Sequence, residues 1–182
     1  FSLPNLKTLE ITRCAKLEVI FPWTILRCLP YLERLEIIEC EELKQIMEED
    51  VQDKKLPYLL SPQPCFPKLA SLFVDQCQNL KGLFSVSASN DLPNLEALII
   101  NGATELEELI GCEQGKGDEI GKAKVEFSKL KLLIFMHLST LRQGTEFMTV
   151  KHRFVHNCPK LSLASTSTLQ ELYENFPYSG KY

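Results

Sequence analysis

The sequence predicts an α/β solenoid, a curved stack of five to six similar coils. Three observations predict this fold class. A pattern of leucine-like residues recurs along the chain, each copy holds one short stretch of alternating apolar and polar residues, and each copy is too small to bury its apolar residues alone. Stacking about three or more such coils joins these residues into one continuous core.

Five copies of the pattern are clear, and a sixth is weaker. The clear copies are "LPNLKTLEITRCAKLEVIF" (3–21), "LPYLERLEIIECEELKQIM" (29–47), "FPKLASLFVDQCQNLKGLF" (66–84), "LPNLEALIINGATELEELI" (92–110) and "FSKLKLLIFMHLSTLRQGT" (127–145). The weaker copy is "VKHRFVHNCPKLSL" (150–163), where Arg153 replaces the usual Leu, so the regularity of the last coil stays open. The shortest step between copies is 26 residues. Units of about 20 to 29 residues are typical of leucine-rich repeats.

The frame within each copy is L-x-x-L-x-[LIVF]-x-x-[C/A/L]-x-x-L, which the first copy fills with Leu6, Leu9, Ile11, Cys14 and Leu17. Leu9 and Ile11 lie two residues apart, so on a strand they share one buried face. Leu6 and Leu17 fall outside this alternation and suit a chain that turns into and out of the strand. We therefore expect a parallel sheet on the concave face and irregular chain or short helix on the convex side.

The ninth position of the frame holds a Cys in most copies. Its occupants are Cys14, Cys40, Cys77, Ala103, Leu138 and Cys158. In many leucine-rich repeats an Asn at this place hydrogen-bonds to neighbouring backbone, and a buried Cys is a small apolar residue with a weak S–H donor. We therefore interpret these thiols as structural. The seven Cys include no C-x-x-C pair, which disfavours a disulfide framework or zinc site and favours a reducing compartment.

We expect one leucine-rich-repeat domain over residues 1–165, followed by a C-terminal capping helix and tail over 166–182. Two insertions, 48–65 and 111–126, enlarge the repeat unit, and their Pro, Gly and charge content fits solvated loops. The second contains "GCEQGKG", which lacks the spacing of a phosphate-binding loop. Because the first copy begins at residue 3 without a polar cap, we expect the chain to be a piece of a longer one.

The tail predicts a short amphipathic helix. Thr168 and Glu171 have the spacing of a capping box. The apolar residues Leu169, Leu172, Tyr173 and Phe176 then follow helical spacing. We expect this helix to cover the end of the last coil, because solenoid ends need a cap. Docking to a partner is the alternative.

Composition and motifs disfavour several functions. The net charge of −4 argues against a nucleic-acid footprint, and no apolar run is long enough to span a membrane. The three His, namely His137, His152 and His156, fall in different columns of the repeat frame without metal-ligand spacing. We therefore expect no catalytic residue, no metal and no cofactor in this region.

The outward-facing residues of the strands predict a binding surface. The column between the two buried positions reads Glu10, Glu36, Phe73, Ile99, Ile134 and Phe154, so it changes from acidic to apolar along the stack. Neighbours in one column of a parallel sheet lie about 4.8 Å apart. An exposed apolar patch is therefore expected from Phe73, Ile99, Leu132, Ile134, Met136 and Phe154. The alternative is that the C-terminal tail covers this patch.

The other predicted binding residues are polar. Glu10, Arg34, Glu36 and Glu39 would form a selective half of the same concave surface, and Asp75 and Asn101 stand in the column two residues after the middle one. Because contiguous apolar patches usually mark interaction sites, we expect a protein, or another domain of the same chain, to pack on this face.

The repeats resemble a known family. The phrases "LPNLKTLEITRCAKLEVIF" and "FPKLASLFVDQCQNLKGLF", with acidic insertions between copies, resemble the leucine-rich-repeat region of plant nucleotide-binding resistance proteins of the coiled-coil type. The resemblance implies a cytoplasmic immune receptor whose repeats sense a pathogen effector or its host target and restrain a nucleotide switch. The ATP/ADP site would lie in an upstream domain. An F-box substrate adaptor and an extracellular receptor fragment remain the other two classes.

Overall fold

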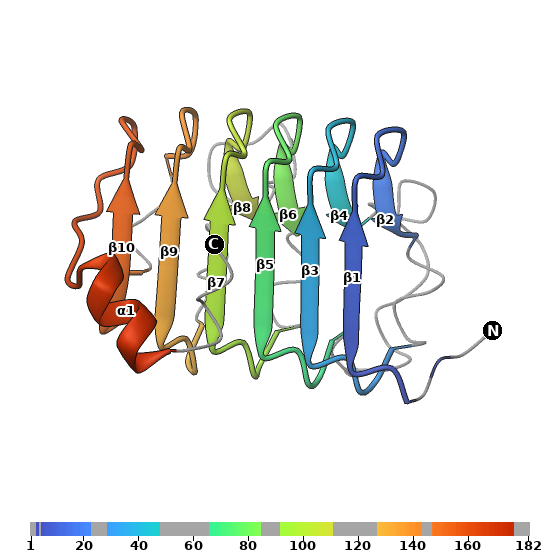
Figure 1. Cartoon of the computed structure of the whole chain (residues 1–182), viewed down its shortest axis with the longest axis horizontal. Helices are drawn as coiled ribbons and strands as arrows, with labels where there is room; N and C mark the ends of the chain where they lie inside the picture. Colours follow the sequence, from blue (N-terminus) through green and yellow to red (C-terminus); the bar gives the residue numbers. More distant parts are fainter. Residues whose placement is uncertain are drawn as a thin grey trace, which may run out of the picture.

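The computed structural model describes residues 3, 5–22, 29–47, 66–84, 92–110, 127–142 and 147–176. Figure 1 shows that these segments form a row of coils, with a long sheet in front and a shorter one behind. The fold is a leucine-rich-repeat solenoid, as the sequence predicts. Both predicted insertions, 48–65 and 111–126, lie outside the described residues. No helix within the described segments is long and apolar enough to cross a membrane.

The front sheet takes one five-residue strand from each coil. Its strands are β1 (Thr8–Thr12), β3 (Arg34–Ile38), β5 (Ser71–Asp75), β7 (Ala97–Asn101), β9 (Leu132–Met136) and β10 (His152–His156). They pair in that order and all in parallel. Leu9 lies opposite Leu35, and Glu36 lies opposite Phe73. The register confirms the three predicted outward columns, including the contribution of the weak sixth copy.

The rear sheet corrects the expectation of irregular or helical chain on the convex side. Four strands of three residues, β2 (Val19–Phe21), β4 (Gln45–Met47), β6 (Gly82–Phe84) and β8 (Glu108–Ile110), form a second parallel sheet in that order. Each ends one of the first four copies, where the sequence is rich in Val, Ile, Phe and Met, residues that favour strands. Each of the first four copies therefore contributes a strand to both sheets.

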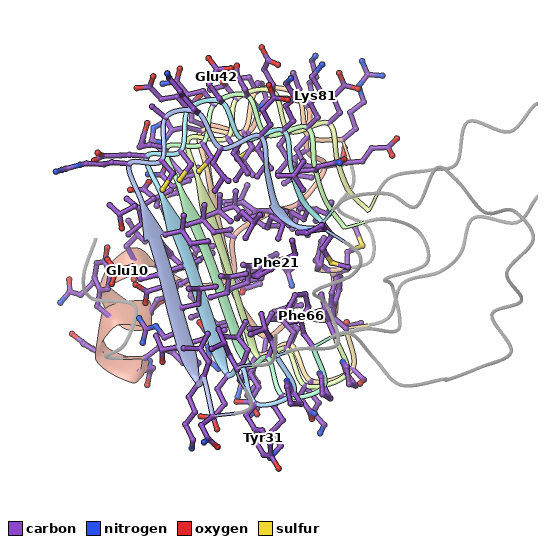
Figure 2. The ribbon with its side chains drawn as sticks, turned by 90° about the vertical axis from the view of Figure 1, so that its right-hand side faces the viewer. Glu10, Phe21, Tyr31, Glu42, Phe66 and Lys81 are labelled. Carbon is purple, nitrogen blue, oxygen red and sulfur yellow. The ribbon has the colours of Figure 1, made fainter. Side chains whose placement is uncertain are left out.

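The main core lies between the two sheets. Figure 2 shows the side chains of Phe21, from β2, and Phe66 on the inner side of the front sheet, and their ring centroids are 5.3 Å apart. Leu32, Leu35, Ile37 and their counterparts in the next three coils have almost no exposed surface. The first coil is less protected, because Leu6, Leu9 and Ile11 are only half-buried. Burial across neighbouring coils is therefore the main stabilising contribution, at about 25 cal/mol per Å² of apolar surface.

Two tight turns connect the strands of a coil and explain the Leu residues outside the alternation. The first turn precedes the front strand, as where Leu32 N donates to Leu29 O at 3.3 Å. Pro30 is the second residue of that turn, a position that suits its fixed φ. The second turn follows the strand, as where Leu43 N donates to Cys40 O at 3.2 Å. Leu32 and Leu43 thus enter the core from the two bends of one coil.

A left-handed residue follows each front strand. Positive φ values occur at Arg13, Glu39, Gln76, Gly102, His137 and Asn157. The backbone amide of this residue continues the sheet, since Arg13 N donates to Ile38 O and Glu39 N to Asp75 O, both at 2.9 Å. Side chains in this conformation cost about 1 to 2 kcal/mol per residue. Only Gly102 avoids that cost, and a Cβ there would lie 2.7 Å from Nε2 of Gln76.

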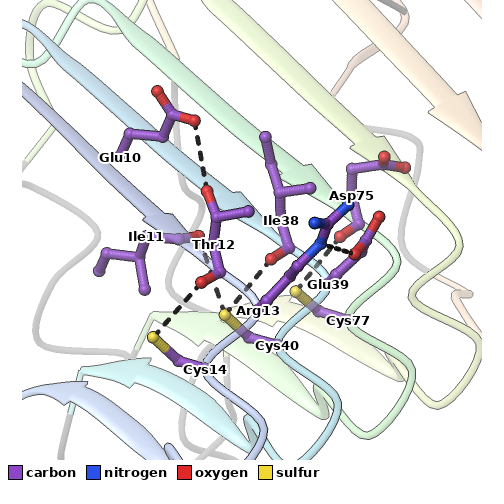
Figure 3. Close-up of polar contacts among 10 residues, drawn as sticks. All are labelled: Glu10, Ile11, Thr12, Arg13, Cys14, Ile38, Glu39, Cys40, Asp75 and Cys77. Carbon is purple, nitrogen blue, oxygen red and sulfur yellow. Dashed lines mark hydrogen bonds and ion pairs between the residues drawn. The ribbon is translucent and has the colours of Figure 1, made fainter.

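The Cys column forms a ladder of weak hydrogen bonds between coils (Figure 3). Cys40 Sγ donates to Ile11 O of the preceding coil at 3.8 Å, and Cys77 Sγ reaches Ile37 O at 4.0 Å. Both thiols are fully buried, and burial raises the pKa of Cys77 to about 12. A thiol with so high a pKa is a poor nucleophile at neutral pH. These contacts support the structural role that the repeat frame predicts for the Cys.

The last coil is regular despite Arg153. β10 pairs with β9 over its full length, and Arg153 lies opposite the core residue Leu133. Its guanidinium group donates to three backbone carbonyls at the end of the solenoid: those of Ala164 at 2.7 Å, Met148 at 2.8 Å and Val150 at 2.9 Å. Within the described residues no further coil follows the sixth one, so a polar side chain can occupy this column there.

Candidate functional site

The candidate site is the outer face of the six-stranded sheet, the face turned away from the rear sheet. Figure 2 shows Glu10 and the C-terminal helix on this side, with Phe21 and Phe66 on the opposite side. The helix, α1 (Leu169–Asn175), crosses in front of β9 and β10 (Figure 1). The outer face is therefore divided into an apolar half that carries α1 and a polar half at β1 and β3.

The apolar half is not the exposed patch that the sequence predicts. Phe73, Ile99, Leu132 and Ile134 are between 2% and 6% exposed and form one cluster with Leu172 of α1, which is fully buried. Met136 and Phe154 are half-buried against that cluster. The tail therefore covers the patch, which was the alternative interpretation. The reason is that α1 packs its apolar side on the sheet and not on the end of the last coil.

The predicted helix is present with the predicted cap and the predicted apolar side. Thr168 Oγ1 accepts a hydrogen bond from Glu171 N at 3.2 Å, and the Glu171 carboxylate accepts one from Thr168 N at 2.7 Å. Leu172 is buried, while Leu169 and Tyr173 are half-exposed at the edge of the contact. The ring of Phe176 packs edge-on against His152 at 5.3 Å. The polar residues of the helix face solvent.

The chain between the last coil and α1 protects the edge of the sheet. Ser165 Oγ accepts a hydrogen bond from Val155 N at 2.8 Å, and Thr166 Oγ1 accepts one from Arg153 N at 3.1 Å. The amide of Thr166 donates in turn to Arg153 O at 2.9 Å. These contacts occupy the outer edge of β10, which would otherwise present unpaired backbone groups. They also direct the chain back toward the outer face.

The polar half carries two ion pairs at different depths. Arg13 pairs with Glu39 across two coils, Nε to Oε2 at 2.6 Å, in an exposed position (Figure 3). Arg34 pairs with Glu36 on the same strand, and Glu36 is only 5% exposed. Glu36 is therefore not the accessible recognition residue that its outward position predicts. Glu10 is exposed and accepts a hydrogen bond from Thr12 at 3.3 Å.

A row of polar side chains lies where the strands end. Asn101 Nδ2 donates to Asp75 Oδ1 at 2.8 Å, and Asn101 Oδ1 lies 3.0 Å from Nδ1 of His137. Burial raises the pKa of Asp75 above its ordinary value, and the nearby Glu39 adds to the shift, while the bond from Asn101 opposes it. Asp75 and Asn101 also line a small pocket beside Leu169 and Tyr173 of the helix. The structure thus brings these predicted residues next to α1.

The raised pKa of Asp75 makes a prediction about stability and pH. The folded state holds the Asp75 proton more tightly than the unfolded chain, so the charged carboxylate costs stability at neutral pH. That cost disappears as the pH falls through the folded pKa toward the ordinary value. Asp75→Asn should therefore stabilise the domain at pH 7 by less than about 1 kcal/mol, because Asp75 is partly solvated. Urea unfolding at pH 7 and pH 4 measures this gain. A variant less stable than wild type at pH 7 would contradict it.

Three residues of the site were not among the predicted ones. Leu172 is the centre of the apolar cluster, but the tail was assigned to the end of the solenoid. Arg13 and His137 occupy the left-handed position after a strand, the same column as the predicted Glu39. Gly102 in that column was the available sequence signal for positive φ. Within the described segments, no group of three or more His, Cys, Asp or Glu is arranged to hold a metal ion.

The chain matches a family of known proteins. A family model described as "Plant disease resistance protein RPS2-like, leucine-rich repeats" matches residues 1–59 and 41–179, two overlapping segments that together cover almost the whole chain. No curated protein matches the chain, and no solved structure does.

Proposed function

Because this chain belongs to the leucine-rich repeats of RPS2-like plant disease resistance proteins, we propose that it is the protein-recognition module of a cytoplasmic immune receptor. Its outer face binds a pathogen effector or the host protein that the effector targets. In the absence of that partner, the module restrains an upstream nucleotide-binding domain, which would hold the ATP or ADP. The module itself recognises protein and does not catalyse a reaction.

The observation that carries this proposal is the continuous outer face with its open polar half. Parallel strands in one register place side chains from successive coils in straight columns, which suits the recognition of a protein surface. Three carboxylates, Glu10, Glu36 and Glu39, stand there with two guanidinium groups, Arg13 and Arg34. Glu10 and Glu39 are exposed, whereas Glu36 is nearly buried against Arg34. The excess of negative charge favours a partner with a basic contact surface.

The family match also favours this proposal over the two other classes. The matching model describes resistance-protein repeats, and it covers the same copies that carry the sequence resemblance. An F-box adaptor or an extracellular receptor would use a similar solenoid face, since fold alone does not determine function. The choice therefore depends on the family match together with the acidic polar half.

The test is a charge reversal on the polar half in the complete receptor. Glu10→Lys with Glu39→Lys should weaken partner binding about tenfold or more, because both carboxylates are exposed on the proposed contact surface. The matched control is Glu41→Lys with Glu42→Lys, two exposed carboxylates in the turn beyond β3. The readouts are effector-triggered cell death and the affinity for the purified effector or host protein. Equal responses from both double variants at equal protein levels would contradict the proposed face.

Restraint is measured by expressing the same receptor variants in plant tissue without the effector. A variant that loses restraint triggers cell death alone, whereas one that loses recognition stays silent in both conditions. The two halves of the proposal therefore fail separately.

A further inference from the structure

We propose that the apolar half of the outer face is a helix-binding groove, occupied by α1 within the chain and taken over by an amphipathic helix of the partner. The inference deepens the proposed function, on which it rests, by naming the chemistry of the partner. The groove is formed by Phe73, Ile99, Leu132 and Ile134, whose side chains meet Leu172 in a cluster separate from the main core. The structure thus contains one example of a ligand that fits.

The spacing of the groove suits a helix. Side chains in one column of the sheet repeat about every 4.8 Å, and residues three or four apart on a helix lie about 5 to 6 Å apart. Leu169, Leu172, Tyr173 and Phe176 use this match, with Leu172 at the centre and the others around it. A partner helix needs the same pattern of apolar residues, and its polar side remains in solvent.

The contact of α1 is small enough to be displaced. α1 has seven residues, and isolated helices shorter than about 12 residues are marginal in water. Leu172 is the one residue of α1 whose side chain is fully buried. A longer partner helix could continue from the apolar half across the polar half at β1 and β3, whereas α1 lies in front of β9 and β10 (Figure 1). It would therefore gain contacts that α1 lacks.

Residues 165–168, which tether α1 to the last coil, explain how the helix can leave without exposing the edge of the sheet. Ser165 and Thr166 hold the edge of β10 through their hydroxyl groups, and α1 begins at Leu169. Release of the helix therefore does not require release of the edge. A short tether keeps α1 at an effective concentration in the millimolar range, so it competes with any helix of modest affinity.

The test uses the full 182-residue chain and a fluorescent peptide of residues 165–176 as the probe. Leu172→Asp in the full chain should empty the groove, because it puts a charge at the centre of the apolar contact. The probe should then bind about tenfold more tightly than it binds to wild type, as removal of an internal competitor predicts. Glu174→Gln, an exposed change on the same helix, is the matched control and should behave as wild type. Fluorescence anisotropy gives the affinities.

Two further variants make the result decisive. Leu172→Asp combined with Ile134→Asp should lose probe binding, because Ile134 belongs to the groove and not to the helix. Thr168→Ala removes the capping box but no groove contact, so it should weaken α1 and raise probe affinity by a few fold. It replaces Leu172→Asp as the test if that variant does not fold. The proposal is overturned if neither single variant binds more tightly than wild type, or if the double variant still binds. These results do not depend on the effector, so they separate this inference from the proposed function.

Discussion

Phe135→Ala should lower the free energy of unfolding by about 3 to 5 kcal/mol, the usual cost of removing a large buried aromatic side chain. Phe135 has no exposed surface, and its ring packs edge-on against Phe147 at 5.7 Å. Phe147 in turn stacks on Phe127 at 5.6 Å. The cavity would therefore lie where three rings hold the fifth and sixth coils together.

The measurement is chemical unfolding followed by circular dichroism, with Met148→Ala as the control. Met148 is 58% exposed, so its truncation should change the stability by less than about 0.5 kcal/mol. Because each coil contacts only its neighbours, we also expect the last two coils of Phe135→Ala to unfold before the others. A loss of less than about 1 kcal/mol would mean that the ring cluster does not hold these coils together.

Arg153→Leu should destabilise the domain by about 2 kcal/mol, although it restores the residue that the repeat frame prefers. The substitution removes charged donors from three backbone carbonyls, and hydrogen bonds to charged groups contribute about 1.5 to 3 kcal/mol each when water cannot replace them. Water can reach part of this site, since Arg153 is half-buried. We therefore expect a net loss of about 2 kcal/mol, well below the sum for three such bonds.

Arg142→Leu is the control for this experiment, because Arg142 is exposed and belongs to the fifth copy, not to the last coil. Amide hydrogen exchange should place the loss of protection in residues 148–150, in β10 and in residues 161–167, where the bonded carbonyls and the edge segment lie. Stability equal to or above that of wild type would show that a regular leucine column matters more than the bonded carbonyls.

The front sheet could be predicted from the sequence in detail. Leu9 and Ile11, two residues apart and with apolar counterparts in each of the first five coils, fix which side chains point inward, and that choice also fixes the register of the neighbours. The capping box of α1 was equally clear, because Thr168 and Glu171 interact locally. In both cases the information lies within a few residues of the element.

The rear sheet and the place of α1 could not be predicted in the same way. Strands of three residues such as Gln45–Met47 are too short for a periodic pattern, and stacking between coils makes them pair. The surface that α1 covers depends on the direction in which the chain leaves β10. That direction is set by contacts of Ser165 and Thr166 with the strand, which are tertiary interactions.

The hydroxyl-bearing segment beside β10 has a consequence for how such proteins can change in size. A stack of similar coils has no preferred length, so a further segment must end it. Here that terminator is formed by Ser165 and Thr166, whose hydroxyl groups hydrogen-bond to the backbone of the last coil, and it is separate from the repeats. Gain or loss of a 26-residue unit before β5 would leave the terminator, the apolar cluster and α1 unchanged. The outer face could therefore lengthen or shorten in steps of about 4.8 Å. Its helix-covered end would stay constant while its open end becomes longer or shorter.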